Sequence, residues 1–147
     1  MERFERFTVL ISNITRSIRK IKTEEMSRWG LRSHHVLCIY YLYTKGALTS
    51  KKLCGFCNED KANISRSIDY LEVEGFIAQK GNSKKKYNVQ YQLTEKGSSV
   101  GRIITERIDE IIGSAADALS DEERATMYHC LEVIDSRLGA ISDEYKK

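Results

Sequence analysis

The sequence contains no proline, only 9 glycines in 147 residues, and no run of eighteen apolar residues. Because proline interrupts helices and glycine-rich chains form loops, this scarcity favours long helices over an all-β or loop-rich design. The missing apolar run predicts that no helix spans a membrane, and the N-terminal MERFERF does not resemble a secretory signal. At about 150 residues per domain, we expect one domain or one closely joined pair, in the cytoplasm.

Cysteine is also scarce, with Cys38, Cys54, Cys57 and Cys130 unevenly spaced along the chain. A chain of this length buries its own core, so four such residues do not form the framework of a disulfide-rich fold. We expect reduced thiols.

The charge is unevenly distributed, although 24 basic and 21 acidic residues give a net charge of only +3. Residues 1–104 hold 19 basic and 10 acidic side chains, whereas residues 105–147 hold 5 basic and 11 acidic ones. The first part is therefore suited to a polyanionic partner and the second is not.

Apolar residues recur at alternating steps of three and four near both ends of the chain, a pattern typical of long helices with one apolar side. A helix with such a seam needs another long helix to cover it, from the same chain or a second copy. The residues that we predict to form a dimer interface are Phe4, Phe7, Ile11, Ile14, Met127, Leu131, Ile134 and Leu138. A third long helix is predicted from Val100 to Leu119, and Ser120 is the predicted N-cap of the last one.

The middle of the chain predicts three shorter helices. The first starts behind Ser33 and ends near Gly46; the second runs from a Thr49 cap through Cys57; the third runs from an Asp60 cap to Glu74. Asn58, which tolerates the left-handed conformation, is predicted to make the turn between the last two. This is a helix-turn-helix pattern.

A β-hairpin is predicted after Gly75, from strands at 76–80 and 88–93. Val89, Tyr91 and Leu93 alternate with polar residues and should form its buried face. Its tip carries a basic turn made of Ser83, Lys84, Lys85 and Lys86.

A helix-turn-helix followed by a basic hairpin is a winged-helix pattern, which binds duplex DNA through the second helix and the wing. Ile64, Ile68 and Leu71 should face inward, so that base edges can be reached by Lys61, Ala62, Asn63, Ser65, Arg66 and Ser67. The wing lysines suit phosphates. Within its own helix Arg66 could instead bridge to Asp69 or Glu72.

The run from Leu53 to Ile77 resembles the helix-turn-helix of the MarR winged-helix transcription regulators, with its Ser-Arg and Leu-Glu…Gly…Ile signposts. Leu93-Thr-Glu-Lys-Gly97 is similar to that family's junction between the wing and the next helix, and the resemblance extends over nearly the whole chain. The family's wing often carries Asp-Arg-Arg, whereas here Lys85-Lys86-Tyr87 stand in the corresponding stretch, which predicts looser wing contacts.

The resemblance implies a mainly helical homodimer with residues 33–94 as the winged helix-turn-helix and residues 1–32 and 95–147 as the dimerisation region. It implies binding to pseudo-palindromic double-stranded DNA, repression relieved by a small aromatic ligand or an oxidant, and a location at the nucleoid. It also implies a ligand pocket near the middle of the chain, for which the candidate residues are Trp29, His34, His35 and Tyr40.

The alternative functions are those of a thiol sensor, an enzyme and a protein adaptor. Cys54 and Cys57 suggest a thiol sensor, although packing within the helix-turn-helix is the favoured interpretation. Zinc would need a second ligand pair near them, but the histidines lie at 34, 35 and 129, so we predict no metal and no cofactor. No motif joins a nucleophile to a base, so we predict no enzyme. A winged-helix adaptor that contacts only proteins is the remaining alternative.

Overall fold

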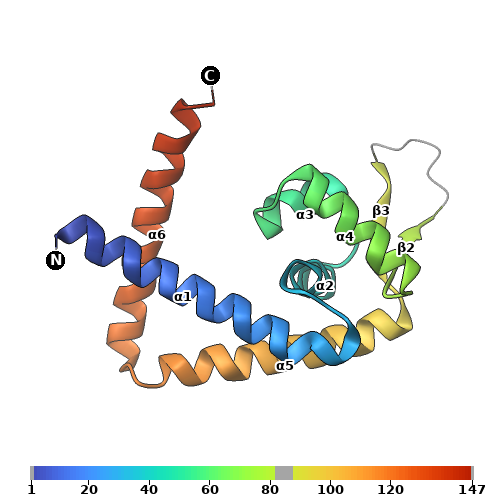
Figure 1. Cartoon of the computed structure of the whole chain (residues 1–147), viewed down its shortest axis with the longest axis horizontal. Helices are drawn as coiled ribbons and strands as arrows, with labels where there is room; N and C mark the ends of the chain where they lie inside the picture. The colour runs from blue at the N-terminus through green and yellow to red at the C-terminus, as the bar shows by residue number, and fades with distance from the viewer. Residues whose placement is uncertain (1, 82–87, 147) are drawn as a thin grey trace. The chain divides into compact units, whose positions relative to one another are not determined.

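The computed structural model describes residues 2–81 and 88–146, and in these ranges the chain is mainly helical with one small sheet (Figure 1). The elements in order are α1 (Arg3–Met26), a short 3-10 helix η1 (Ser27–Trp29), α2 (Ser33–Lys45), β1 (Leu48–Thr49), α3 (Ser50–Cys57), α4 (Lys61–Val73), β2 (Ile77–Lys80), β3 (Gln90–Leu93), α5 (Glu95–Ala116) and α6 (Asp121–Glu144). The predicted fold class is confirmed.

The chain divides into two compact units, Met1–Arg107 and Ile108–Lys147. Helix α5 begins in the first unit and ends in the second. This division follows packing within one chain, whereas the predicted division at residues 33 and 94 follows function and stays a prediction.

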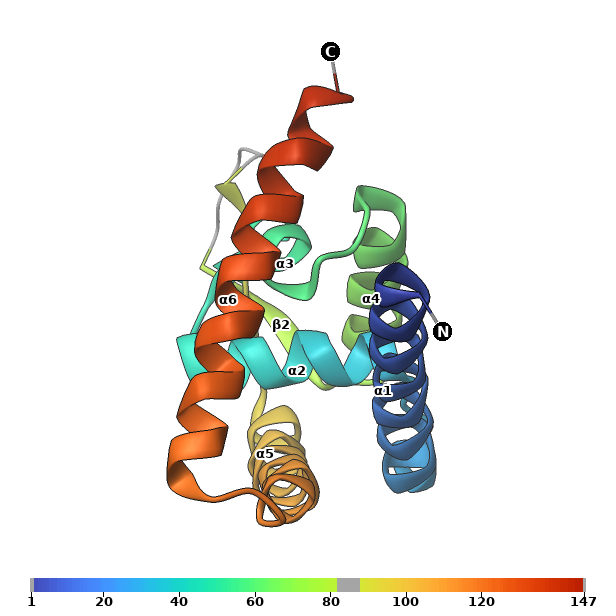
Figure 2. The same ribbon diagram turned by 90° about the vertical axis from the view of Figure 1, so that its left-hand side faces the viewer.

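The first unit is built around α2, which contacts α1, α3, α4 and β3. Figures 1 and 2 both place α2 in the middle of these helices. Its Val36, Cys38 and Ile39 are completely buried, in keeping with the apolar run that predicted a central helix. The other buried apolar residues of this unit are Met26, Leu31, Leu42, Leu48, Leu53, Cys57, Ile64, Ile68, Leu71, Phe76, Ile77, Val100 and Ile104.

The sheet has three antiparallel strands in the order β1-β3-β2, with Leu48 opposite Tyr91 and Ile77 opposite Leu93. Strand β1 was not predicted, because two residues are too few to show an alternating pattern. Val89, Tyr91 and Leu93 were predicted to be buried, but the structure shows them only half-buried. A sheet of three short strands is too small for the helices packed against it to bury one of its faces completely.

The end of α4 is joined to the start of α5 by a compact set of hydrogen bonds. Gly75 adopts the left-handed conformation, with φ of 77°, and the amide of Phe76 bonds the carbonyl of Leu71, which is a Schellman ending. The Thr94 hydroxyl donates to the Gly75 carbonyl at 2.6 Å, and the Thr94 hydroxyl oxygen accepts the Gly97 amide at 3.1 Å. The predicted helix stop at Gly75 and the junction at Leu93–Gly97 are confirmed.

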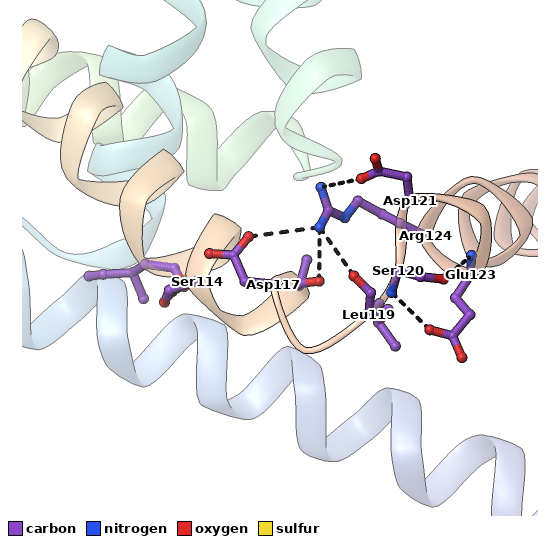
Figure 3. Close-up of polar contacts among 9 residues, drawn as sticks. Ser114, Asp117, Leu119, Ser120, Asp121, Glu123 and Arg124 are labelled. Carbon is purple, nitrogen blue, oxygen red and sulfur yellow. Dashed lines mark hydrogen bonds and ion pairs between the residues drawn. The ribbon is translucent and has the colours of Figure 1, made fainter.

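In the second unit, the turn between α5 and α6 is held by its own side chains (Figure 3). Ser120 and Glu123 form a reciprocal capping box at the start of α6, as the sequence predicts. The Arg124 guanidinium donates to the carbonyl oxygens of Ala116, the last residue of α5, at 3.2 Å and of Leu119, in the turn, at 3.4 Å.

The two terminal helices keep most of their apolar residues at the surface of the chain. Met26 is the one buried residue among the described side chains of α1, whereas Phe4 is 76% exposed and Ile14 is 54% exposed. On α6, Leu138 is 53% exposed. Within the described residues, no helix is long and apolar enough to cross a membrane.

Candidate nucleic-acid interface

Helix α4 is started by the local sequence that precedes it. Asn58 adopts the left-handed conformation with φ of 51°, and Asp60 accepts a hydrogen bond from the Asn63 amide at 2.7 Å. An acidic N-cap satisfies a free amide and complements the positive end of the helix. The backbone of Asn58 therefore ends α3, and the side chain of Asp60 starts α4. Both roles, and the Thr49 cap of α3, are as predicted.

The first turns of α4 present a row of polar side chains to solvent. Lys61, Ala62, Ser65 and Arg66 are exposed and Asn63 is half-buried, while Ile64, Ile68 and Leu71 are buried against the core. Ser67 is the exception to the prediction. It is completely buried and its hydroxyl donates to the Asn63 carbonyl at 2.9 Å, so it cannot reach a base. A buried serine in a helix often bonds the carbonyl four residues back, which is why the position tolerates a hydroxyl.

The exposed part of α4 carries a chain of polar contacts. The Arg66 guanidinium donates to the Asn63 side-chain oxygen, and the Asn63 amide nitrogen donates to Glu59 at 3.1 Å. The sequence also allowed Arg66 to bridge to Asp69 or Glu72. In the structure it bonds Asn63, one turn back along the helix, instead. The guanidinium is therefore held near the N-terminal end of α4, where a recognition helix meets base edges.

Tyr70 joins α4 to Gly30 and to His35 of α2. The Tyr70 hydroxyl donates to the Gly30 carbonyl at 2.8 Å, and the His35 ring stacks on the Tyr70 ring with centroids 4.3 Å apart. His35 Nδ1 also accepts the Arg32 amide at 3.1 Å, which caps the start of α2. His35 is thus a packing residue of the helix-turn-helix.

Burial lowers the pKa of His35 to about 4, with the neighbouring His34 and Arg32 adding to the effect. Burial also lowers the pKa of His34, against the opposing charge of Glu59. A neutral His35 keeps the lone pair on Nδ1 that accepts the Arg32 amide. The hydrogen bond that His35 accepts from the Arg32 amide therefore requires the neutral imidazole.

The four residues predicted to line a ligand pocket make separate contacts, and a pocket shared by them stays a prediction. His34 and His35 are in contact at 4.1 Å between ring centroids, Trp29 stacks with Arg28, and Tyr40 lies against Tyr41. A cavity of about 290 Å³ lies between α1, α2 and the turn from α3 to α4. Its lining consists of Thr15, Ile18, Arg19, Lys22, Ser33, Leu37, Cys57, Asn58 and Glu59.

Two further exposed basic residues lie in the first helix of the helix-turn-helix, and the sequence analysis did not single them out. Lys51 and Lys52 are exposed in the first turn of α3, directly after the Thr49 cap. Lysine is unfavourable at the positive end of a helix, so a pair of them there was a usable signal of phosphate contacts. In a helix-turn-helix the first helix crosses the DNA backbone.

The wing is described only at its base, where the exposed Lys80 ends β2 opposite Gln90. The predicted wing contacts Ser83, Lys84, Lys85 and Lys86 lie outside the described residues.

A helix-turn-helix with an anchored second helix, followed by a small antiparallel sheet, defines a winged-helix fold. Among solved structures, this chain is similar over nearly its whole length to regulators of the MarR family. A MarR family regulator from Neisseria meningitidis covers 98% of this chain and 99% of its own, with a TM-score of 0.79 and 17% identity. The transcriptional regulator SlyA covers 96% and 99%, with a TM-score of 0.81 and 23% identity.

A third similar structure is that of S. aureus MepR in complex with DNA, which covers 90% of this chain and 97% of its own, with a TM-score of 0.81 and 19% identity. No family model matches the sequence, and no curated protein matches it. The chain therefore has the winged-helix fold of MarR family transcription regulators, as its sequence motifs indicated.

Proposed function

We propose that this protein is a transcription regulator that binds double-stranded DNA in a sequence-specific manner. The observation that carries the proposal is the exposed row of Lys61, Ala62, Ser65 and Arg66 on a helix whose opposite side is buried. An α-helix presented in this way fits the major groove, where each base pair has its own pattern of donors and acceptors. The existence of a DNA complex of MepR, which is similar in fold, supports binding to DNA.

Each side chain has a distinct role in this proposal. Arg66 can donate two parallel hydrogen bonds to guanine, and Asn63 can pair with adenine. Lys51 and Lys52 hold point charges that suit phosphates, as do Lys84, Lys85 and Lys86 in the wing sequence. Bases then supply specificity, and the lysines supply affinity that depends on salt.

We further propose that two copies bind together through their terminal helices. Phe4, Ile11 and Ile14 on α1, and Leu131 and Leu138 on α6, leave apolar area in water that a second copy would cover. Phe7, Ile18, Met127 and Ile134 continue the two seams as half-buried residues. A two-fold dimer presents two α4 helices to half-sites about 34 Å apart, which matches a pseudo-palindromic operator.

We propose repression relieved by a small aromatic ligand as the mode of regulation. The cavity beside the turn from α3 to α4 combines the apolar side chains of Ile18 and Leu37 with the charges of Arg19 and Lys22. A ligand bound there lowers DNA affinity only by as much as it prefers the conformation that does not bind DNA. Asn58 and Glu59 line the cavity and belong to the turn before α4, so a ligand that contacts them could favour one position of α4 over another.

The test is to measure the affinity for fragments from the source genome as a function of salt. We expect selected fragments to bind with an affinity that falls steeply as salt rises. Replacing Lys51 and Lys52 with alanine should lower the salt slope by about one for each lost phosphate contact and leave the order of preferred sequences unchanged. Retention that is absent or independent of salt would instead support the protein adaptor.

A further inference from the structure

Glu59 lies between the two helices of the helix-turn-helix, and the end of α3 holds its backbone in place. Asn58 adopts the left-handed conformation, and the Glu59 amide donates to the Cys54 carbonyl at 3.2 Å. The Asn58 amide donates to the Gly55 carbonyl at 3.3 Å, and the two bonds together form a Schellman ending. The backbone of Glu59 is therefore fixed by α3, while its half-buried side chain stands directly before the Asp60 cap of α4.

The Glu59 carboxylate accepts a hydrogen bond from the side-chain amide of Asn63 at 3.1 Å. The same amide nitrogen donates to the Asp60 carboxylate at 3.4 Å, so both amide hydrogens of Asn63 have a carboxylate acceptor. The amide oxygen of Asn63 accepts the Arg66 guanidinium at 2.5 Å. The reverse orientation of the amide would set its oxygen against two carboxylates, so the charges around Asn63 decide which of its atoms meets Arg66.

This arrangement bears on which base α4 can read. In the major groove an asparagine pairs with adenine by donating one amide hydrogen and accepting with its oxygen, whereas an arginine pairs with guanine by donating two hydrogen bonds. The amide hydrogens of Asn63 are used within the protein, so its pairing with adenine requires the bond to Glu59 to break. Arg66 is exposed, and a guanidinium has enough donors to bond both Asn63 and a guanine.

We propose that Glu59 is a positioning residue that sets the base preference of α4: it holds the Asn63 amide so that Arg66 reads guanine and pairing with adenine is disfavoured. The proposal rests on the proposed function, because it requires α4 to meet base edges. The hydrogen bonds from Asn63 to Glu59 and from Arg66 to Asn63 carry it. A guanidinium that is already oriented loses less conformational freedom on binding. A carboxylate near the DNA also repels phosphates, so Glu59 lowers overall affinity while it raises selectivity.

The bond to Glu59 is tested without DNA, by the NMR signals of the Asn63 side-chain amide in the full chain. Glu59→Gln removes the charge but keeps a side-chain oxygen that can accept, whereas Glu59→Ala removes both. The bonded amide hydrogen should therefore lie downfield in the native protein and in Glu59→Gln relative to Glu59→Ala, with folding checked by circular dichroism. Identical amide signals in all three proteins would overturn the proposal, whether or not the protein binds DNA.

The base preference is tested by selecting duplexes from a randomised pool with the native protein and the two Glu59 variants. The position read by Arg66 is the one whose preference is lost in Arg66→Ala. At that position we expect the native protein to prefer guanine over adenine about tenfold or more. Glu59→Ala should reduce this preference to about threefold or less, because Asn63 and Arg66 are no longer held, while Glu59→Gln should keep it.

The charge of Glu59 has a separate effect that the same variants measure. Both should bind unrelated duplexes more tightly than the native protein, because one negative charge is removed. Asp69→Ala, which removes an exposed carboxylate from the same helix, is the matched control and should keep the native preference for guanine. An equal loss of that preference in Glu59→Gln and Glu59→Ala would assign the effect to charge and overturn the positioning role, as would an unchanged preference in Glu59→Ala.

Failure of the proposed function gives a different result. A native protein that selects no sequence from the pool contradicts DNA reading by α4, and the base preference with it. The NMR comparison then shows by itself whether Glu59 holds Asn63 in the folded chain.

Discussion

Arg66 donates a hydrogen bond of 2.5 Å to the side-chain oxygen of Asn63, so the two candidate base-reading side chains of α4 are bonded to each other. Asn63 is held in turn by Glu59, at the end of the preceding turn. A long arginine side chain loses less conformational freedom on binding when it is already oriented. In the proposed function, Asn63 would therefore act both by contacting a base and by orienting the Arg66 guanidinium.

We expect Arg66→Ala to weaken binding to a preferred DNA site by about 1–3 kcal/mol and to relax the preference at one base position. Asn63→Ala should weaken it as well, and the double variant should lose less than the sum, because the residues act together. Fluorescence anisotropy with matched and mismatched duplexes measures both effects. Arg102→Ala, which removes an exposed arginine from α5, is the control and should bind as the native protein does. Fully additive losses would mean that the bond between Asn63 and Arg66 does not matter on DNA.

The exposed seam on α1 gives a prediction about assembly. Ile14→Glu places a charge in an apolar seam that we propose to be covered by a second copy, so it should shift the protein from dimer to monomer. Ser12→Glu adds the same charge on another side of the same helix and should leave the dimer intact. Light scattering coupled to size exclusion gives the mass directly. A native protein that is monomeric at micromolar concentration, or a dimer that tolerates Ile14→Glu, would contradict the proposed interface.

Protonation of His35 gives a prediction about pH. Its pKa is about 4 in the folded chain and 6.5 when unperturbed, so between these values the unfolded chain takes up a proton that the folded chain does not. Stability must therefore fall as pH falls through this range, and it is unaffected by this group above pH 6.5. Between pH 7 and pH 5 the loss from His35 is about 2 kcal/mol.

The matched variant for this prediction is His35→Gln. Glutamine at this position of a helix can still accept the Arg32 amide, but it does not titrate. Urea unfolding at several pH values should show a pH dependence that is smaller by about 2 kcal/mol in the variant, whatever its stability at pH 7. The same pH dependence in both proteins would refute the role given to His35.

Gly97 gives a prediction about the junction of the wing with α5. A Cβ at this position would collide with the backbone carbonyl of Phe76, which already accepts the Thr94 amide. Gly97→Ala should cost about 1–3 kcal/mol, because backbone cannot move aside as a flexible side chain does. Gly55→Ala is the control: it lies in α3 with open space around its Cβ, and it should raise stability by about 0.5–1 kcal/mol. Thermal or urea unfolding of both variants measures the contrast, and an unaffected Gly97→Ala protein would show that the junction can move.

The local signals in the sequence predicted the helix boundaries well. Thr49, Asp60 and Ser120 each cap the helix assigned to them, and Asn58 and Gly75 adopt the left-handed conformation expected of them. These features depend on hydrogen bonds and steric limits within a few residues, which a sequence shows directly. The MarR-like order of motifs added the arrangement that local signals alone do not give.

Features that depend on distant contacts were harder to predict. Ser67 is buried because α4 is rotated by its packing, and a one-residue error in the facing of a helix turns a side chain by about 100°. His35 stacks on Tyr70, which is 35 positions away in the sequence, and no local pattern shows this contact. Strand β1 exists only because Leu48 and Thr49 pair with β3.

The sequence by itself determined where the helices begin and end, which of their sides are apolar, and which turn separates α3 from α4. Short-range hydrogen bonding and hydrophobic periodicity decide these features. Only the tertiary structure decided that Tyr70 holds α4 through Gly30, that His35 stacks on the Tyr70 ring, and that Lys22 of α1 and Leu37 of α2 line one cavity. These contacts join residues that are far apart along the chain, and they form only when α1, α2 and α4 pack together, which no local pattern specifies.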